Sequence, residues 1–323
     1  MNAIHLMLGA SFLWSLYPAL IAISGEKIGA PLFVIIIHLS CGISAGLFAW
    51  MTIKQKPAVW HNLKYYTKTL EFDAWLYLLL IGLATTLYNF CFFYAMQMTS
   101  KVGAAIIIEL WPLFAMFLAP LFISKTWNKL GLRDYLIGGI GIVGVVVVSY
   151  DASGAESFLS LFGNGGTESI TGILLALIGG LFVAVSIVLS SEVGNRISKH
   201  ILQEDKPTVK CAAIAEVVRR LVALPPSFLL LWAFKDDLAW TVNGIYVSVA
   251  TGIVVFTIGS LLMRVALLNA KSSNINMLYY ISPVLAVLWL CLLGIGELSG
   301  GIVLGGALVI IANILIIDKN RKT

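Results

Sequence analysis

Apolar residues occur along the chain in long uninterrupted runs of about 20 residues, separated by short polar breaks. A helix of that length spans the roughly 30 Å hydrocarbon core of a bilayer, because each residue adds about 1.5 Å. The runs lack the alternation of apolar and polar residues that is typical of membrane barrel strands. They predict ten transmembrane helices, at residues 4–23, 31–53, 74–97, 102–123, 133–150, 170–191, 211–234, 243–268, 273–295 and 300–317.

The composition supports a membrane protein with many spans. The 323-residue chain is 59% hydrophobic and 11% charged, whereas soluble domains are about 25% charged. The first run has no Lys or Arg before it and is longer than the apolar region of a signal peptide. We therefore interpret this run as the first membrane helix.

Basic residues predict the orientation of the helices. With ten helices, both termini lie on one side, and 15 of the 21 Lys and Arg residues fall in the connections and tails of that side. The other side holds only Lys27, Lys101 and Lys235. The positive-inside rule then predicts that both termini are cytoplasmic, in an inner or plasma membrane. The basic residues on that side account for the net charge of +5. Membrane lipid is therefore the expected partner, and a nucleic acid is not.

Two segments of the chain resemble each other. Residues 95–112 and 266–283 both begin with Ala, contain a short polar break and end with Pro. An offset of 171 residues therefore relates the third and fourth predicted helices to the eighth and ninth. Because each half has five helices, an odd number, the second half is inverted, as in many secondary transporters. We predict an all-α membrane protein of two inverted five-helix repeats, 1–150 and 170–323, joined by an extracytoplasmic linker at 151–169.

One carboxylate stands in the middle of an apolar run. Glu109 lies in the stretch "AAIIIELWPLF" of the fourth predicted helix. A carboxylate that faced lipid at the bilayer centre would cost about 2.5–3.5 kcal/mol. We therefore expect Glu109 to face the bundle interior or a water-filled cavity. It would carry a proton coupled to transport, bind a cationic group of the substrate, or serve as a structural hydrogen-bond partner.

Two prolines occupy matching positions in the two halves. Pro112 removes a backbone donor and clashes with the carbonyl of residue 108, so the fourth helix should kink there. Pro283 should do the same in the ninth helix. Paired breaks point towards the transport path, although prolines are common in transmembrane helices in general.

Positive charges mark the seventh run, which is the weakest of the ten predicted helices. Arg219 and Arg220 stand about nine residues into it, and His38 holds a similar place in the second run. A guanidinium group can hold a carboxylate through two hydrogen bonds. Alternatively, the arginines extend to lipid headgroups or pair with Glu216, which shares a helix face with Arg220. His38 would either bind substrate or be a packed hydrogen-bonding residue.

Other polar and aromatic residues would line a cavity that suits a flat or moderately apolar solute. For each aromatic residue alone, ordinary packing is the alternative. Tyr279 is a further candidate beside Tyr280. The predicted substrate-binding residues are Trp14, Tyr17, His38, Tyr88, Asn89, Glu109, Trp111, Arg219, Arg220, Asn276 and Tyr280.

No pattern of catalytic or metal-binding residues is present in the sequence. Walker, HExxH and GxSxG motifs are absent, and the four cysteines show no metal-ligand spacing. We expect neither an enzyme nor a bound cofactor or metal. The GxxxG pairs, such as Gly301 and Gly305, allow close helix packing, which we expect within a monomer rather than at a dimer seam. The expected state is a monomer or a weak dimer.

Three stretches resemble the drug/metabolite transporter superfamily, in its EamA-like form. They are "ASFLWSLYPAL", "YAMQMTSKVGAAIIIELWPLFAMFLAPLF" and "ALLNAKSSNINMLYYISPVLAVLWLCLLGIGELSGG". Glu297 matches an acidic residue that the family often has before its last helix. The stretches "LWS", "GAPLFVIIIHLSCGISAGLF" and "ELWPLF" look most like the aromatic amino-acid exporter branch. That branch tends to carry an aromatic residue where this chain has Glu109.

The resemblance implies ten helices in two inverted halves and a secondary active exporter that works by alternating access. The expected substrate is an amino acid or a related small metabolite. Arg219 or Arg220 would meet its anionic group, Glu109 a proton or an ammonium group, and the aromatic residues its side chain. An organic cation or drug transporter and an uncoupled facilitator are the alternatives.

Overall fold

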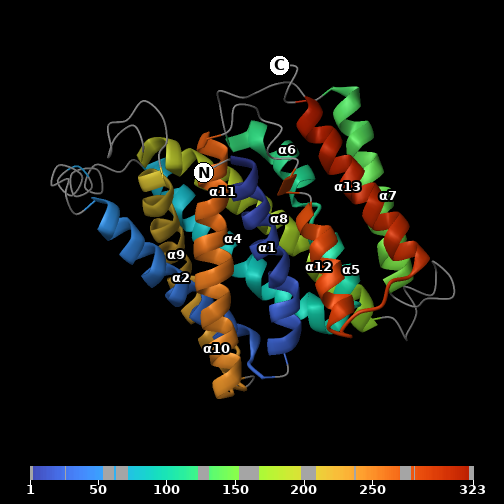
Figure 1. Ribbon diagram of the computed structural model, residues 1–323, viewed down its shortest axis with the longest axis horizontal. Coiled ribbons are helices and arrows are strands. Elements are labelled where there is room, and N and C mark those ends of the chain that lie inside the picture. Colours follow the sequence, from blue (N-terminus) through green and yellow to red (C-terminus); the bar gives the residue numbers. More distant parts are fainter. Residues whose placement is uncertain are drawn as a thin grey trace.

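The computed structural model describes residues 3–25, 27–53, 62, 72–122, 131–152, 167–197, 209–235, 238–269, 278, 279 and 281–319. In this part of the chain the regular structure is helical, apart from an isolated bridge between Ile28 and Trp240. Figure 1 shows the helices, which are α1 (Ala3–Ser24), α2 (Ala30–Ile53), α4 (Phe72–Met98), α5 (Lys101–Ile108), α6 (Trp111–Phe122), α7 (Leu132–Ala152), α8 (Thr167–Ile197), α9 (Val209–Ala233), α10 (Val242–Ala250), the π-helix η5 (Thr251–Gly259), α11 (Ser260–Asn269), α12 (Ile281–Leu292) and α13 (Gly300–Lys319).

Six helical stretches are long and apolar enough to cross a membrane, judged by length and composition. They are Ala3–Ser24, Ala30–Met51, Ala74–Met98, Lys101–Leu118, Ile170–Ser190 and Val242–Ala266. The shorter apolar helices of the described residues are Tyr135–Val148, Ile281–Leu292 and Gly300–Ala312. Helix α9, over the predicted run 211–234, belongs to neither group, because charged residues interrupt its apolar sequence.

Two predicted helices are present as apolar helical stretches, and the structure adds detail to each. The predicted helix 102–123 is divided into α5 and α6, because Pro112 breaks the helix rather than only bending it. In the predicted helix 243–268, the central turns of the helix are π-helical rather than α-helical. The apolar pattern does not distinguish these forms, since both bury the same kind of side chain.

Of the ninth predicted helix, 273–295, the structure describes α12, which ends at Leu292, earlier than expected. Residues 270–277 and 280 lie outside the described residues, and α12 starts at Ile281. Its end is set by Gly294, whose φ of 65° is left-handed. Ile295 N–H then donates to the Leu290 carbonyl at 2.9 Å, and Gly294 N–H donates to the Cys291 carbonyl at 3.0 Å. This pattern is a Schellman motif, which ends the helix and satisfies its last carbonyl groups.

The predicted linker 151–169 is shorter at both ends than expected. Helix α7 continues to Ala152 and α8 begins at Thr167. Residues 153–166 lie outside the described residues.

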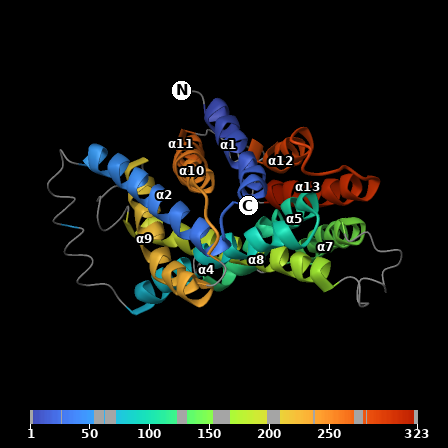
Figure 2. The same cartoon turned by 90° about the horizontal axis from the view of Figure 1, so that it is seen from below.

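The helices pack in pairs that join distant parts of the chain. Helix α2 packs on α9, and α7 packs on α13. Helix α1 packs on α12, η5 and α11, while α8 packs on α6 and α4. Figure 2 shows α2 and α9 at one end of the bundle and α7 and α13 at the other, with α1 and α12 on one side and α4 and α8 on the opposite side.

Glycine residues allow the closest of these contacts. A Cβ atom on Gly144 of α7 would lie 2.8 Å from the Gly305 carbonyl oxygen, and one on Gly305 of α13 would lie 2.6 Å from the Gly144 oxygen. The two backbones therefore approach with no room for a side chain. The expectation that Gly301 and Gly305 serve packing within the chain is confirmed at Gly305.

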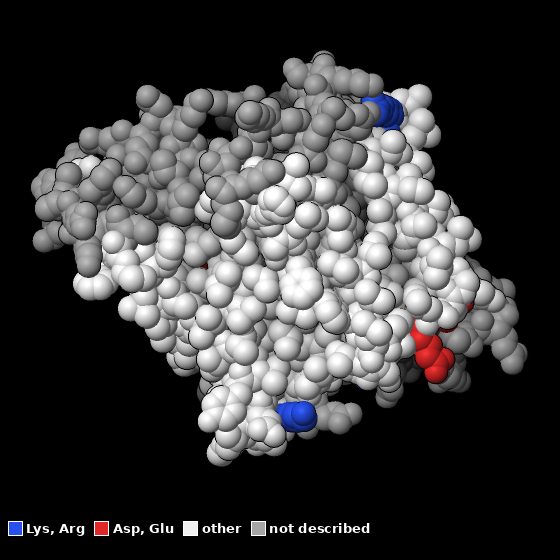
Figure 3. Space-filling view, viewed as in Figure 1, with Lys and Arg blue, Asp and Glu red and all other residues white. Residues whose placement is uncertain are grey.

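The surface is that of a membrane-embedded bundle. Figure 3 shows a broad face of the described residues that is almost free of charged side chains, which lie near its edges. Exposed large apolar side chains cover the helices, among them Leu79, Val143, Leu229, Trp232 and Val303. Because the start of α1 and the end of α13 lie at the same end of the bundle (Figure 1), the helices carry the chain back to the side on which it begins.

Candidate functional site

The break between α5 and α6 places Glu109 at a helix end. Pro112 is the second residue of α6 and has no N–H to offer to the carbonyl of Ile108. The last turn of α5 tightens instead, with Glu109 N–H donating to the Ile106 carbonyl at 3.1 Å and Leu110 N–H donating to the Ile107 carbonyl at 3.2 Å. The regular helix is interrupted between Ile108 and Trp111, and this brings the carboxylate to the C-cap of α5.

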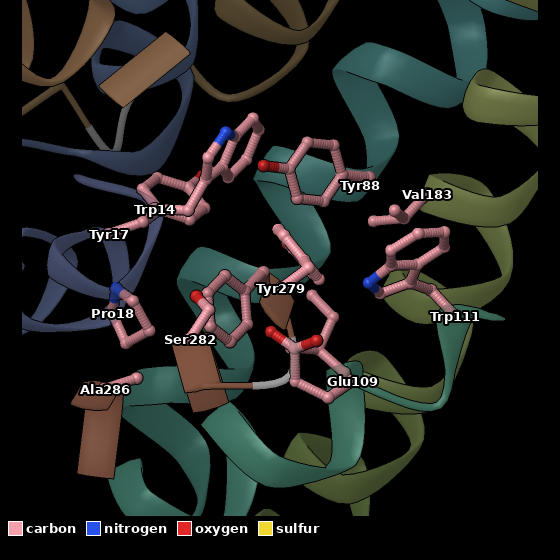
Figure 4. Close-up of a pocket in the computed structure, with 12 residues that line it drawn as sticks. Trp14, Tyr17, Pro18, Tyr88, Glu109, Trp111, Val183, Tyr279, Ser282 and Ala286 are labelled. Carbon is pink, nitrogen blue, oxygen red and sulfur yellow. The ribbon is translucent and has the colours of Figure 1, made fainter. Parts of the chain in front are cut away.

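A cavity of about 50 Å³ lies at this break. It is bounded by α1, α4, the α5–α6 break, α8, Tyr279 and α12 (Figure 4). The residues that line it are Trp14, Tyr17, Pro18, Tyr88, Phe92, Ile108, Glu109, Trp111, Val183, Tyr279, Ser282 and Ala286. A cavity of this size holds a few water molecules, whereas ligand pockets usually measure about 300–1,000 Å³. A metabolite would need the walls to move.

Glu109 is the acidic residue of the cavity wall, and its side chain is partly exposed. Figure 4 shows its carboxylate facing the space between the aromatic side chains. Trp111, two residues further along the chain, lines the same cavity. The Trp111 ring also meets the Tyr279 ring edge to face, with centroids 6.0 Å apart. Aromatic residues of two different helical segments thus surround the carboxylate.

Tyr17 is held in the cavity wall by Asn89. The Tyr17 hydroxyl donates to Asn89 Oδ1 at 2.5 Å, and Asn89 Nδ2 donates to the Thr85 carbonyl at 2.7 Å. Asn89 is fully buried and does not line the cavity. In this structure Asn89 therefore stands behind Tyr17 and holds its hydroxyl, and a contact of Asn89 with a substrate stays a prediction.

The predicted basic residues form a separate buried cluster, which we call the arginine cluster: His38, Glu216, Arg219 and Arg220. Glu216 Oε1 accepts hydrogen bonds from Arg219 Nη2 at 2.7 Å and from Arg220 Nε at 2.9 Å. Arg220 Nη1 lies 3.1 Å from His38 Nδ1. The side chain of Arg220 is 1% exposed and that of Arg219 is 12% exposed. Of the three alternatives for the arginines, the structure shows pairing with Glu216.

Phe256 of η5 connects the cavity wall to the arginine cluster. Its ring centroid lies 5.1 Å from that of Trp14 and 4.9 Å from that of Tyr17. The guanidinium carbon of Arg220 lies 4.6 Å from the centroid of the same ring, a cation–π contact. Phe256 was not among the predicted site residues, because one phenylalanine in an apolar run carries no signal of its own.

The structure brings together five of the predicted site residues. Trp14, Tyr17, Tyr88, Glu109 and Trp111 line the cavity, as does the further candidate Tyr279. Within the described residues, His38, Arg219 and Arg220 do not line it.

Two predicted site residues, Asn276 and Tyr280, lie outside the described residues. Pro283 is the third residue of α12 and so lies in the first turn of a helix, as Pro112 does in α6. Phe92 and Ser282 were missed. Phe92 was detectable, since it stands four residues after Tyr88 on the same helix face.

A metal site is not evident in the part of the chain that the structure describes. No group of three or more His, Cys, Asp or Glu side chains there is arranged to hold an ion. Three described cysteines, Cys41, Cys91 and Cys291, are free thiols.

Comparison with known proteins finds a family similarity in the N-terminal part of the chain. Residues 1–150 match the EamA-like transporter family. The chain is also similar to a protein of known crystal structure, at 18% identity and a TM-score of 0.59 over 99% of this chain and 98% of that one, which shows a shared fold. None of the curated proteins compared with the chain matched it. The family match over residues 1–150 and the apolar helices together indicate a multi-pass membrane protein.

Proposed function

Since residues 1–150 match the EamA-like transporter family, we propose that the protein is a secondary transporter that exports amino acids or related small metabolites by alternating access. The observation that carries this proposal is that Glu109 stands at a helix break and lines an aromatic cavity inside the bundle. Ionisable residues within membrane helices commonly mark substrate or ion pathways.

The proposal includes ten membrane crossings in two inverted five-helix halves. The offset of 171 residues carries α4, Phe72–Met98, onto residues 243–269, close to the range of α10, η5 and α11. The repeat makes α1 equivalent to α8, α6 equivalent to α12, and α4 equivalent to η5 with α11. The contacts follow this equivalence, because α1 packs on α12 and α8 packs on α6. In the same way, α4 packs on α8, and η5 and α11 pack on α1. The pairs α2 with α9 and α7 with α13 each join equivalent helices. These exchanges support an inverted repeat.

In this proposal the cavity between the halves is the substrate site. The rings of Trp14, Tyr17, Tyr88 and Trp111 receive the apolar part of the substrate, and Glu109 receives a proton or an ammonium group. Kinks at Pro112 and Pro283 would let the helices bend as the halves rock. The bias of basic residues supports cytoplasmic termini in an inner or plasma membrane.

Transport by purified protein in liposomes tests the proposal. We would measure counterflow and pH-driven uptake of labelled phenylalanine for wild type, Glu109→Gln and a control, Glu297→Gln, whose carboxylate is exposed outside the cavity. Wild type and the control should show both activities, and Glu109→Gln should keep counterflow but lose the response to a pH gradient. No phenylalanine signal in wild type would reject the amino-acid substrate, and unchanged uptake by Glu109→Gln would reject its proton role.

A second candidate function is the transport of organic cations. Among the residues that line the cavity, Glu109 is the one carboxylate, aromatic rings surround it, and the arginines lie elsewhere. Carboxylates and aromatic faces both attract cations. Competition by quaternary amines in the same liposomes separates this function from amino-acid export, since amines should block flux only if Glu109 binds the substrate cation.

A further inference from the structure

Phe256 lies between the cavity and a second set of polar groups. Its side chain is fully buried. One side of the ring meets Trp14 and Tyr17 of the cavity wall, and the guanidinium group of Arg220 lies over the ring at 4.6 Å. The cavity and the arginine cluster therefore meet at a layer of aromatic side chains, in which Phe256 contacts both Trp14 of the cavity wall and Arg220 of the cluster.

Several buried hydrogen-bond donors next to this layer lack an acceptor. Arginine only donates, so the contact with Arg220 makes His38 Nδ1 the acceptor and leaves the proton on Nε2. Neither His38 Nε2 nor Arg219 Nε has a hydrogen-bond partner among the described residues, and Trp14 Nε1 is in the same position. Unsatisfied buried donors are rare and costly. An acceptor that the described residues do not supply is therefore expected here.

The charges of the cluster point to the same kind of ligand. The two guanidinium groups share one carboxylate oxygen, Glu216 Oε1. This oxygen accepts the hydrogen bonds from Arg219 Nη2 and Arg220 Nε, and it also lies 2.8 Å from Arg220 Nη2. The other oxygen, Oε2, has no partner within the described residues, and a water molecule would satisfy it. Because positive charge exceeds negative charge among the arginines and Glu216, the missing acceptor is best supplied by an anionic group.

We propose that the substrate site extends behind Trp14 and Phe256, where His38, Arg219 and Arg220 receive a carboxylate group of the substrate. This inference rests on the proposed function, in which the aromatic cavity receives the rest of the molecule. Displacement of the two rings joins the cavity to the arginine cluster. It also gives the volume that a cavity of about 50 Å³ lacks for a metabolite.

The backbone that carries Phe256 is suited to such a displacement. Phe256 lies in η5, a nine-residue π-helix within an otherwise α-helical segment. π-helical turns are rare and frequently occur at functional sites. The η5 segment packs on α2, which carries His38, and on α1, which carries Trp14. A change of η5 towards α-helical register would turn the Phe256 ring relative to both partners.

Binding of three related ligands to the purified full-length protein tests this extension. Phenylalanine carries a carboxylate and an ammonium group, 3-phenylpropanoate only the carboxylate, and phenethylamine only the ammonium group. Dissociation constants would be measured by ligand-dependent thermal shifts in detergent for wild type, Phe256→Leu, Arg219→Gln and Arg219→Lys. Phe33→Leu is the matched control, because Phe33 is also fully buried but packs on Phe93.

The expected pattern depends on the charge of the ligand. Arg219→Gln should weaken phenylalanine and 3-phenylpropanoate about tenfold or more and leave phenethylamine unchanged, since one charge-assisted contact is lost. Arg219→Lys should recover part of that loss. Phe256→Leu should strengthen both carboxylate ligands about threefold or more without an effect on phenethylamine, because the smaller side chain opens the partition. Phe33→Leu should change no ligand selectively.

The outcomes separate this inference from the proposed function. Equal changes for all three ligands in Phe256→Leu, as in Phe33→Leu, would show ordinary packing and overturn the extension, while the aromatic cavity stood. An unchanged affinity for 3-phenylpropanoate in Arg219→Gln would overturn it as well. Binding of phenethylamine alone, lost in Glu109→Gln, would favour the cation transporter and overturn the carboxylate site. Binding of none of the ligands by wild type would overturn both proposals.

Discussion

Two carboxylates lie inside this bundle in contrasting settings. Glu216 stands within the unbroken helix α9, is fully buried and pairs with Arg219 and Arg220 of its own helix. Glu109 stands at the C-cap of α5, where the helix is interrupted, and its partly exposed side chain faces a cavity. Of these two glutamates, Glu216 therefore belongs to an ion-pair cluster and Glu109 to a candidate ligand site.

The difference shows that local sequence decides which role a membrane carboxylate can take. Glu216 has arginines three and four residues later, so its charge is matched within two turns of one helix. Glu109 has apolar residues at the corresponding positions and a proline that ends its helix. Removing Glu216 should therefore harm folding, whereas changing Glu109 should mainly alter ligand binding.

The largest effect is expected for Glu216→Ala. The substitution leaves two guanidinium groups buried without their carboxylate, and breaking a buried pair in this way costs about 3–5 kcal/mol. The protein should lose much of its folded yield, and the Tm in detergent should fall. Exposed Glu297→Ala serves as the control, since it should leave the Tm unchanged.

A combined variant sharpens this test. Replacement of Glu216, Arg219 and Arg220 by Leu, Met and Met removes all three charges together, and such apolar replacements are often neutral or stabilising. Its Tm should lie well above that of Glu216→Ala. A Tm for Glu216→Ala equal to that of wild type would contradict the view that the cluster is needed for folding.

Gly82→Ala should have the next largest effect, because Gly82 of α4 lies in close contact with α9, the helix that carries Glu216. A Cβ atom there would lie 2.1 Å from the Val222 carbonyl oxygen of α9, so α4 and α9 would have to separate. Overpacking of this kind costs about 1–3 kcal/mol. The Tm should fall for Gly82→Ala and not for Gly139→Ala, whose added Cβ meets no atom within 4 Å. Equal Tm values for the two variants would refute the close α4–α9 contact.

Tyr17→Phe should have a smaller effect, on the cavity wall alone. It removes the hydroxyl that donates to Asn89 Oδ1 at 2.5 Å and leaves that buried oxygen without its donor. A loss of about 1–3 kcal/mol in the free energy of unfolding is expected. Thermal denaturation in detergent checks it against Tyr246→Phe, an exposed tyrosine. A Tm loss no greater than that of Tyr246→Phe would mean that the hydroxyl does not hold Tyr17 in place.

Helix positions could be predicted from the sequence because the bilayer requires long apolar segments. Helix α4, at Phe72–Met98, lies within two residues of the predicted range 74–97 at each end. The disruption at Pro112 was also predictable, since a missing N–H follows from the residue type. Its extent was not, because the break also depends on the surrounding helices. One of them is α8, where a Cβ atom on Gly180 would lie 3.0 Å from the Ile108 carbonyl oxygen.

The candidate site was predictable only in part, because side chains distant in sequence complete it. Helical spacing indicated that Glu216 and Arg220 share a face, but their contact with His38 of α2 depends on the packing of two helices. Phe256 is one apolar residue among many in its run, and no pattern marks the π-helical turn that carries it. The sequence shows that Asn89 is polar, but its hydrogen bonds with Tyr17 and Thr85 depend on how α1 packs on α4.

The smallest effect on stability is expected for Glu109→Gln. Glutamine keeps the shape of the side chain, so the free energy of unfolding should change by less than about 1 kcal/mol. Binding of a cationic ligand such as phenethylamine should nevertheless weaken about tenfold, since the contact loses its charge. Thermal shifts with and without the ligand measure both quantities in one sample. A Tm loss as large as that of Glu216→Ala, with ligand affinity unchanged, would place Glu109 with Glu216 among the residues that serve folding.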